Sequence, residues 1–224
     1  MKTFPQVHVM FDLDGTLVDT RAAVSECYRR VFRTLLDADF PPAGVPEHDI
    51  FAMRPRELFA RVACDKTDLL FAAYRDTYPA CSDHIALFPG VADLIAELVR
   101  GGRKPSLVTN KGLERTLIDL AFAGIPPESF VAIVTAEDTV ERKPHPAPIL
   151  LGLERANASA ADAVYVGDGP QDVIAAHACG IPAIAVTYGF YDSAVLADHN
   201  PDALVASIVE LARKLGVALI EAAE

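Results

Sequence analysis

The alternation of helix-like and strand-like stretches after Pro89 constrains the fold of this chain more than any other feature. Four amphipathic stretches are each followed by a short apolar run: 91–99 by 105–109, 113–123 by 130–135, 146–156 by 163–166, and 170–179 by 183–186. One more apolar run, Val7 to Phe11, is typical of a buried strand. This order predicts a Rossmann-like α/β core, with a parallel sheet between two helical layers.

The segment between the first strand and Pro89 has a different pattern. It contains three stretches with helical periodicity, at 22–36, 57–63 and 66–78. None of it resembles a strand convincingly. The shift predicts a core domain made of residues 1–19 and 85–224, with an all-helical cap domain inserted at residues 20–84.

The charge balance limits the partners of this chain. It has 31 acidic residues against 20 basic ones, a net charge of −11. This disfavours binding to nucleic acid or to anionic membranes, so an anionic substrate needs local cations or a metal.

The four cysteines form no CxxC pair, and no apolar run has the length of a signal-peptide core or a membrane span. We therefore expect a cytoplasmic protein with reduced thiols, either a monomer or a homodimer.

Two aspartates stand where the first predicted strand ends, in the segment Phe11-Asp12-Leu13-Asp14-Gly15-Thr16-Leu17. In an extended chain, residues two apart face the same side. One carboxylate can attack phosphorus to form an aspartyl phosphate, while the second protonates the leaving oxygen and then activates water. The alternative is a solvated turn rich in Asp and Gly. The length of the motif favours catalysis.

Other polar residues follow later strands or precede helices. They are Thr109 with Asn110, Lys143, and Asp168 with Asp172. Ligands bind at the carboxyl ends of parallel strands, so these residues should meet Asp12 at one edge of the sheet. A hydroxyl and backbone N–H groups at Thr109-Asn110 can hold phosphate, and Lys143 can neutralise phosphoryl oxygens. Taken singly, a structural turn and a solvated lysine are the alternatives.

The acidic segment at residues 165–172 predicts a metal site. Asp168 and Asp172, together with Asp12, can supply the oxygen ligands that Mg²⁺ prefers. A helix cap made by Asp168 is the structural alternative. The presence of Asp12 and Asp14 in the same chain favours the metal site.

These segments together resemble the haloacid dehalogenase superfamily, and within it the phosphoglycolate-phosphatase-like group with a small helical cap. The resemblance covers nearly the whole chain. Its four motifs occur in order: Asp12-Leu13-Asp14-Gly15-Thr16-Leu17, Val108-Thr109-Asn110, Lys143-Pro144-His145-Pro146, and Gly167-Asp168 with Asp172. Motifs in the family's order are far more specific than any one of them.

The resemblance implies a role for each matched residue. Asp12 would be the nucleophile and Asp14 the general acid and base. Thr109 and Lys143 would hold the phosphate, with Asn110 a candidate for substrate binding. The implied ligands of Mg²⁺ are Asp12, the backbone carbonyl of Asp14, Asp168 and Asp172.

Two places depart from the family pattern. Relatives more often have Ser or Thr at the position of Gly169. Residues 51–57 resemble a substrate-specificity loop that usually has a glycine near Ala52. In this loop, Arg54 and Arg56 are candidates for binding a substrate carboxylate or a second phosphate. The alternative is that both are exposed residues at the start of a helix.

The functional hypothesis is a Mg²⁺-dependent phosphatase that hydrolyses small phosphomonoesters, such as phosphoglycolate or sugar phosphates, through an aspartyl phosphate. A phosphosugar mutase of the same superfamily is an alternative, because it uses the same intermediate. A binding protein that kept the fold without catalysis is a second alternative. Haloacid dehalogenation is disfavoured, because relatives with that activity lack the second aspartate, here Asp14.

Overall fold

The computed structural model describes residues 2–45, 50–51 and 53–219. The chain divides into two compact units, Met1–Asp19 with Leu87–Glu224, and Thr20–Ala86. We call them the core unit and the helical unit and describe each by itself. Among the described residues, no helix combines the length and the apolar character needed to cross a membrane.

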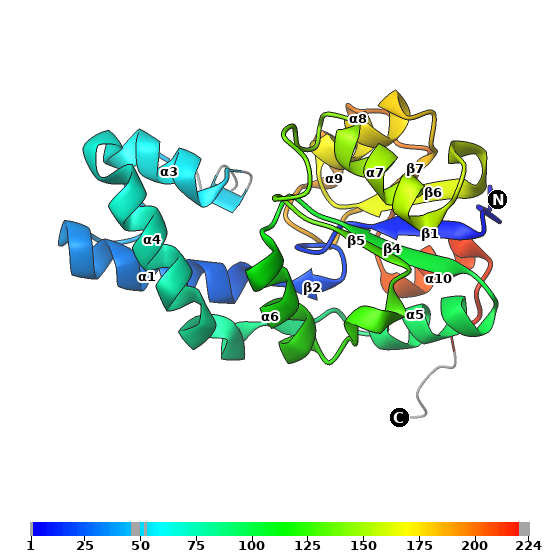
Figure 1. Cartoon of the computed structure of the whole chain (residues 1–224), viewed down its shortest axis with the longest axis horizontal. Coiled ribbons are helices and arrows are strands. Elements are labelled where there is room, and N and C mark those ends of the chain that lie inside the picture. The colour runs from blue at the N-terminus through cyan, green and yellow to red at the C-terminus, as the bar shows by residue number, and fades with distance from the viewer. Residues whose placement is uncertain (1, 46–49, 52, 220–224) are drawn as a thin grey trace. The chain divides into compact units, whose positions relative to one another are not determined.

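A parallel sheet of six strands forms the centre of the core unit, in the order β5-β4-β1-β6-β7-β8 (Figure 1). The strands are β1 (His8–Phe11), β4 (Lys104–Val108), β5 (Ala132–Val134), β6 (Ala163–Gly167), β7 (Ala183–Val186) and β8 (Ala203–Val205). The chain enters the sheet at β1, which pairs with β4 on one side and β6 on the other. The predicted α/β fold is confirmed.

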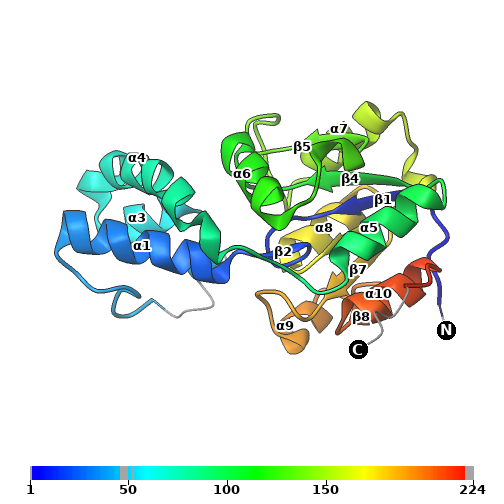
Figure 2. The same ribbon diagram turned by 90° about the horizontal axis from the view of Figure 1, so that it is seen from below.

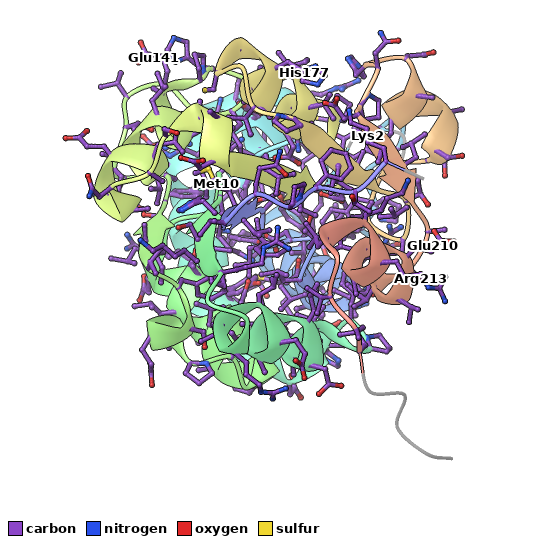
Figure 3. All side chains as sticks on the ribbon, turned by 90° about the vertical axis from the view of Figure 1, so that its right-hand side faces the viewer. Lys2, Met10, Glu141, His177, Glu210 and Arg213 are labelled. Carbon is purple, nitrogen blue, oxygen red and sulfur yellow. The ribbon has the colours of Figure 1, made fainter. Side chains whose placement is uncertain are left out.

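Helices cover both faces of this sheet. They are α5 (Val91–Arg100), α6 (Leu113–Ala123), α7 (Ala147–Ala156), α8 (Pro170–Ala178), α9 (Ser193–Ala197) and α10 (Ile208–Leu215). Figures 1 and 2 show α7 and α8 on one face, and α5 and α10 on the other. Gly152 lets α7 approach the sheet, because a Cβ there would lie 2.6 Å from the end of the Met10 side chain. Figure 3 shows Met10 in the interior and charged side chains such as Glu141 and Arg213 around it.

The sequence predicted no element after residue 186, whereas the structure has α9, β8 and α10 there. Strand β8 has three residues and lies at the sheet edge, so its apolar run is too short to stand out. Helix α10 has clear signals at both ends. The Ser207 hydroxyl accepts a hydrogen bond from the Glu210 amide at 3.2 Å, and Gly216 ends the helix at φ 73°.

The helical unit contains α1 (Arg21–Leu36), α3 (Pro55–Val62) and α4 (Thr67–Thr77), close to the predicted ranges. Two 3₁₀ helices, Cys64–Lys66 and Tyr78–His84, flank α4. Aromatic rings fill its interior: the Tyr28 ring lies 4.8 Å from that of Tyr74 and 5.6 Å from that of Phe59. A two-stranded sheet joins β2 (Val18–Asp19) and β3 (Ala86–Leu87).

Candidate active site

The carboxyl ends of the central strands carry three of the predicted site residues. Asp12 follows β1, Thr109 follows β4 and Asp168 follows β6, and each is at most 7% exposed. The amides of Asp12 and Thr109 extend the strand pairing, donating to the carbonyls of Val166 and Val134 at 2.9 Å. Backbone hydrogen bonds in the sheet therefore fix the positions of Asp12 and Thr109.

Three buried carboxylates converge at this edge. One oxygen each of Asp12, Asp168 and Asp172 can be chosen so that all lie within 4.8 Å of one another. Asp172 lies in the first turn of α8, where its Oδ2 accepts a hydrogen bond from the Gly169 amide at 3.0 Å. The helix start therefore holds one oxygen of Asp172, while its other oxygen, Oδ1, contacts Lys143.

Two glycines make room for Asp168. Gly15 has φ +75°, and a Cβ there would lie 2.0 Å from Asp168 Oδ2. At Gly189, a Cβ would lie 2.4 Å from the Asp168 Cβ. The next amide, that of Phe190, donates to Asp168 Oδ2 at 2.7 Å. Gly189 therefore lies against Asp168 at this edge of the sheet.

Lys143 lies at the centre of the buried charges. Its Nζ lies 2.9 Å from Asp12 Oδ1 and 2.7 Å from Asp172 Oδ1. It also donates to the Tyr165 hydroxyl at 2.7 Å, and this hydroxyl donates to the Val108 carbonyl at 2.7 Å. The sequence placed Tyr165 only within a strand, because an aromatic residue in an apolar run is ordinarily part of the core.

Asn110 positions the loop that carries Lys143. Its side-chain amide donates to the Lys143 carbonyl at 2.9 Å, and its Oδ1 accepts from the Lys143 amide at 3.1 Å. The sequence predicted Asn110 to bind substrate. In the structure, its side chain bridges two motifs that are 33 residues apart, and its contact with substrate stays a prediction.

Two further charged residues belong to this region and were not predicted. Lys111 Nζ lies 2.7 Å from Asp14 Oδ1 and also contacts Asp119, a residue of α6. Lys111 is 7% exposed, and Asp119 is fully buried. The sequence feature that could have indicated Asp119 is its spacing. It lies three residues after Thr116, so both lie on the same face of α6, and that face is buried.

The electrostatics of the site depend on this burial. Burial raises the pKa of Asp12 to about 7, against the effect of Lys143 and with the help of Asp172. Burial, followed by Asp172 and Asp12, also raises the pKa of Asp168 well above its usual range. The nearby carboxylates keep the pKa of Lys143 high and therefore keep it charged, although its own burial acts in the opposite direction.

The donor set fits a divalent cation. Three buried carboxylates face one another, and Lys143 supplies one positive charge to two of them. Burial disfavours the ionised form of a carboxylate, and a nearby cation stabilises that form. The ligand atoms are all oxygens, which suits Mg²⁺ and other hard divalent ions. Asp12, Asp168 and Asp172 could therefore hold such an ion.

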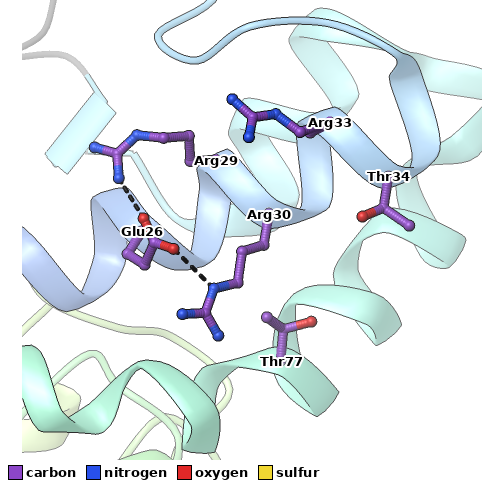
Figure 4. Close-up of a pocket in the computed structure, with 6 residues that line it drawn as sticks. All are labelled: Glu26, Arg29, Arg30, Arg33, Thr34 and Thr77. Atoms are coloured by element: carbon purple, nitrogen blue, oxygen red, sulfur yellow. Dashed lines mark hydrogen bonds and ion pairs between the residues drawn. The ribbon is translucent and has the colours of Figure 1, made fainter.

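The predicted residues of the helical unit are engaged locally. Arg54 precedes α3 and pairs with Glu57, and Arg56 pairs with Asp68 at 2.7 Å. Both arginine side chains are at least half exposed. Ala52 lies outside the described residues. A hollow of about 390 Å³ in this unit contains none of the predicted site residues (Figure 4); its lining is Glu26, Arg29, Arg30, Arg33, Thr34 and Thr77.

Comparisons with known proteins agree with this architecture. A family model described as haloacid dehalogenase-like hydrolase matches residues 9–186. The chain is 32% identical over 222 residues to the phosphoglycolate phosphatase of Yersinia pseudotuberculosis serotype I (strain IP32953), with 93% of each chain covered. It is 29% identical to the pyrophosphatase PpaX of Bacillus pumilus (strain SAFR-032), with 93% of this chain and 95% of that one covered.

The fold of this chain is also similar to that of a solved structure. CbbY from Rhodobacter sphaeroides, in complex with phosphate, superposes with a TM-score of 0.81 at 25% identity. The match covers 95% of this chain and 100% of that one. The chain therefore belongs to the haloacid dehalogenase-like hydrolase family, as its four motifs predicted, and is similar over almost its whole length to phosphatases of that family.

Proposed function

We propose that this protein hydrolyses small phosphomonoesters with the help of Mg²⁺, and that Asp12 is its nucleophile. One observation carries the proposal: Asp12 lies buried at the end of the central strand, within contact of Lys143 and beside Asp168 and Asp172. A buried carboxylate held by a cation at a strand end is suited to attack on phosphorus. The phosphatases to which the chain is similar support this proposal.

The proposed reaction has two steps. A carboxylate oxygen of Asp12 forms a bond to phosphorus as the bond to the ester oxygen breaks, and Asp14 gives that oxygen its proton. Water then attacks the aspartyl phosphate while Asp14 takes up a proton. This releases inorganic phosphate and restores Asp12. Asp14 is suited to this work because its side chain is 24% exposed, against 9% for that of Asp12.

Lys143 and a bound metal ion would offset the negative charge of the nucleophile and of the phosphoryl group. Lys143 holds Asp12 and Asp172 in place and offsets charge on the transferring phosphoryl group. When bound, Mg²⁺ lets an anionic nucleophile approach an anionic ester. Asp12, Asp168, Asp172 and the backbone carbonyl of Asp14 are its proposed ligands. Thr109, at the end of β4, is the proposed phosphate holder.

The substrate is a small phosphorylated metabolite. The relatives are named phosphoglycolate phosphatase and pyrophosphatase, so substrates with a second anionic group are the first to test. We assign substrate selection to the helical unit. Arg54 and Arg56 would bind the second anion, since both are exposed and each can leave a surface ion pair at low cost.

The test is a panel of phosphomonoesters that includes phosphoglycolate, hexose phosphates and p-nitrophenyl phosphate, assayed for phosphate release with Mg²⁺ and with chelator. Chelation and Asp12→Asn should each abolish release. An acid quench should trap a hydroxylamine-sensitive phosphoprotein from the wild type but not from Asp12→Asn. Circular dichroism shows whether the variant is folded. Turnover that persists in folded Asp12→Asn contradicts the mechanism.

A further inference from the structure

We propose that Lys111 and Asp119 are positioning residues for Asp14, and that they set the orientation in which Asp14 gives and takes its proton. The inference deepens the proposed function and rests on it. Neither residue is part of the four motifs. The observation behind it is a chain of charges that runs from Asp14 through Lys111 to a buried aspartate on α6.

The contacts of Lys111 hold it at both ends. Its Nζ lies 2.7 Å from Asp14 Oδ1 and contacts Asp119 Oδ2. Its backbone amide donates to the Thr109 hydroxyl at 3.1 Å, and its carbonyl accepts from the Ala136 amide at 2.9 Å. A long side chain anchored in this way presents its ammonium group at one point. Lys111 therefore fixes one oxygen of Asp14.

Burial distinguishes this arrangement from a surface ion pair. The side chain of Lys111 is 5% exposed and that of Asp119 is fully buried, whereas that of Asp14 is 24% exposed. Placing a carboxylate and an ammonium group inside a protein costs desolvation energy, and apolar residues of similar volume often stabilise a fold at least as well. Stability alone is therefore a weak reason for this pair. The exposed end of this chain of charges is Asp14, the carboxylate that has to reach the substrate.

The need for a proton from Asp14 depends on the leaving group of the substrate. An alkoxide leaving group needs a proton as its bond to phosphorus breaks, whereas p-nitrophenolate leaves without one. An Asp14 carboxylate that is free to rotate would deliver that proton less often. Loss of Lys111 should therefore slow alkyl phosphates much more than p-nitrophenyl phosphate. A defect in phosphate binding or in folding would slow both.

The experiment compares kcat/KM for p-nitrophenyl phosphate with that for the alkyl phosphomonoester that the wild type turns over fastest in the panel. Lys111→Met should lower the alkyl-to-aryl ratio about 30-fold, a part of the 10²–10⁴ that proton transfer contributes. Asp119→Asn should lower it about 5-fold, because Lys111 keeps its charge but loses its anchor. Lys111→Arg should recover part of the ratio. Glu114→Gln, which removes an exposed carboxylate from the same helix, should leave it unchanged.

Two results overturn the inference. One is an equal loss on both substrates in folded Lys111→Met, and the other is an unchanged ratio in both Lys111→Met and Asp119→Asn. If Lys111→Met does not fold, the ratio measured with Asp119→Asn decides. Failure of the proposed function is a separate result, because the wild type would then release no phosphate, or Asp12→Asn would remain active.

Discussion

His8, at the start of β1, makes the stability of the core unit depend on pH. It is 1% exposed, and neither ring nitrogen has a hydrogen-bond partner. Burial, and then Lys104 on the neighbouring strand, lower the pKa of His8 from 6.5 to about 4. Between these values the unfolded chain binds a proton that the folded protein excludes. Stability should therefore be lost as the pH falls from 6.5 towards 4.

The size of this effect follows from the two pKa values. At pH 7.5 the imidazole is neutral in both states and contributes almost nothing. At pH 5 the unfolded state is protonated and the folded state mostly is not, which lowers the free energy of unfolding by about 2 kcal/mol. His8→Leu removes the titrating group and the buried nitrogens. His8→Asn removes the titration but keeps polar atoms.

The assay is denaturant unfolding of the whole protein, followed by circular dichroism at pH 7.5 and pH 5. The stability of each variant relative to wild type should rise by about 2 kcal/mol at the lower pH, because all other titrating groups cancel. His8→Asn should be less stable than His8→Leu by a constant amount, since only Asn buries polar groups. If wild type and both variants have parallel pH profiles, the reasoning is wrong.

Three further predictions concern the site. Tyr165→Phe removes a hydroxyl bonded to Lys143 and Val108; it should lower kcat/KM in the phosphatase assay, and a melt should show a loss of about 1–3 kcal/mol. Asp168→Asn should abolish the rise in melting temperature that Mg²⁺ gives the wild type, without lowering the metal-free value; a retained Mg²⁺ shift contradicts the ligand assignment. Gly189→Ala should also weaken that shift, because its Cβ would meet Asp168 at 2.4 Å, and an unchanged shift would show that the loop adapts.

Much of the core could be predicted because local patterns and global topology agree. For each of the four predicted helix and strand pairs after Pro89, the structure has a helix followed by a strand in the same part of the chain. Strand β7 matches its predicted range. Parallel topology then brings Asp12, Thr109 and Asp168 to one edge without further information. For these residues, position along a strand is enough.

The residues that were missed depend on contacts across the sequence. Tyr165, Lys111 and Asp119 look like ordinary core or surface positions until partners 22, 97 and 8 residues away are in place. Asn110 has a structural role that the sequence did not indicate. A polar side chain beside a motif suggested contact with substrate, while its two hydrogen bonds go to the backbone of Lys143. The spacing of residues along the sequence does not reveal partners that come together only in the folded chain.

The place of β1 in the middle of the sheet has a consequence for synthesis of the protein. It is the first strand to be made, but its partners β4 and β6 end at residues 108 and 167. Until β6 has been made, the apolar segment His8–Phe11 lacks one of its two neighbouring strands, and Asp168 and Asp172, which lie beside the Asp12 carboxylate, follow later still. The helical unit consists of contiguous residues and can form earlier. A chain stopped before residue 167 would therefore contain all the residues of the helical unit, whereas the sheet of its core would lack a complete β6 and the strands that follow it.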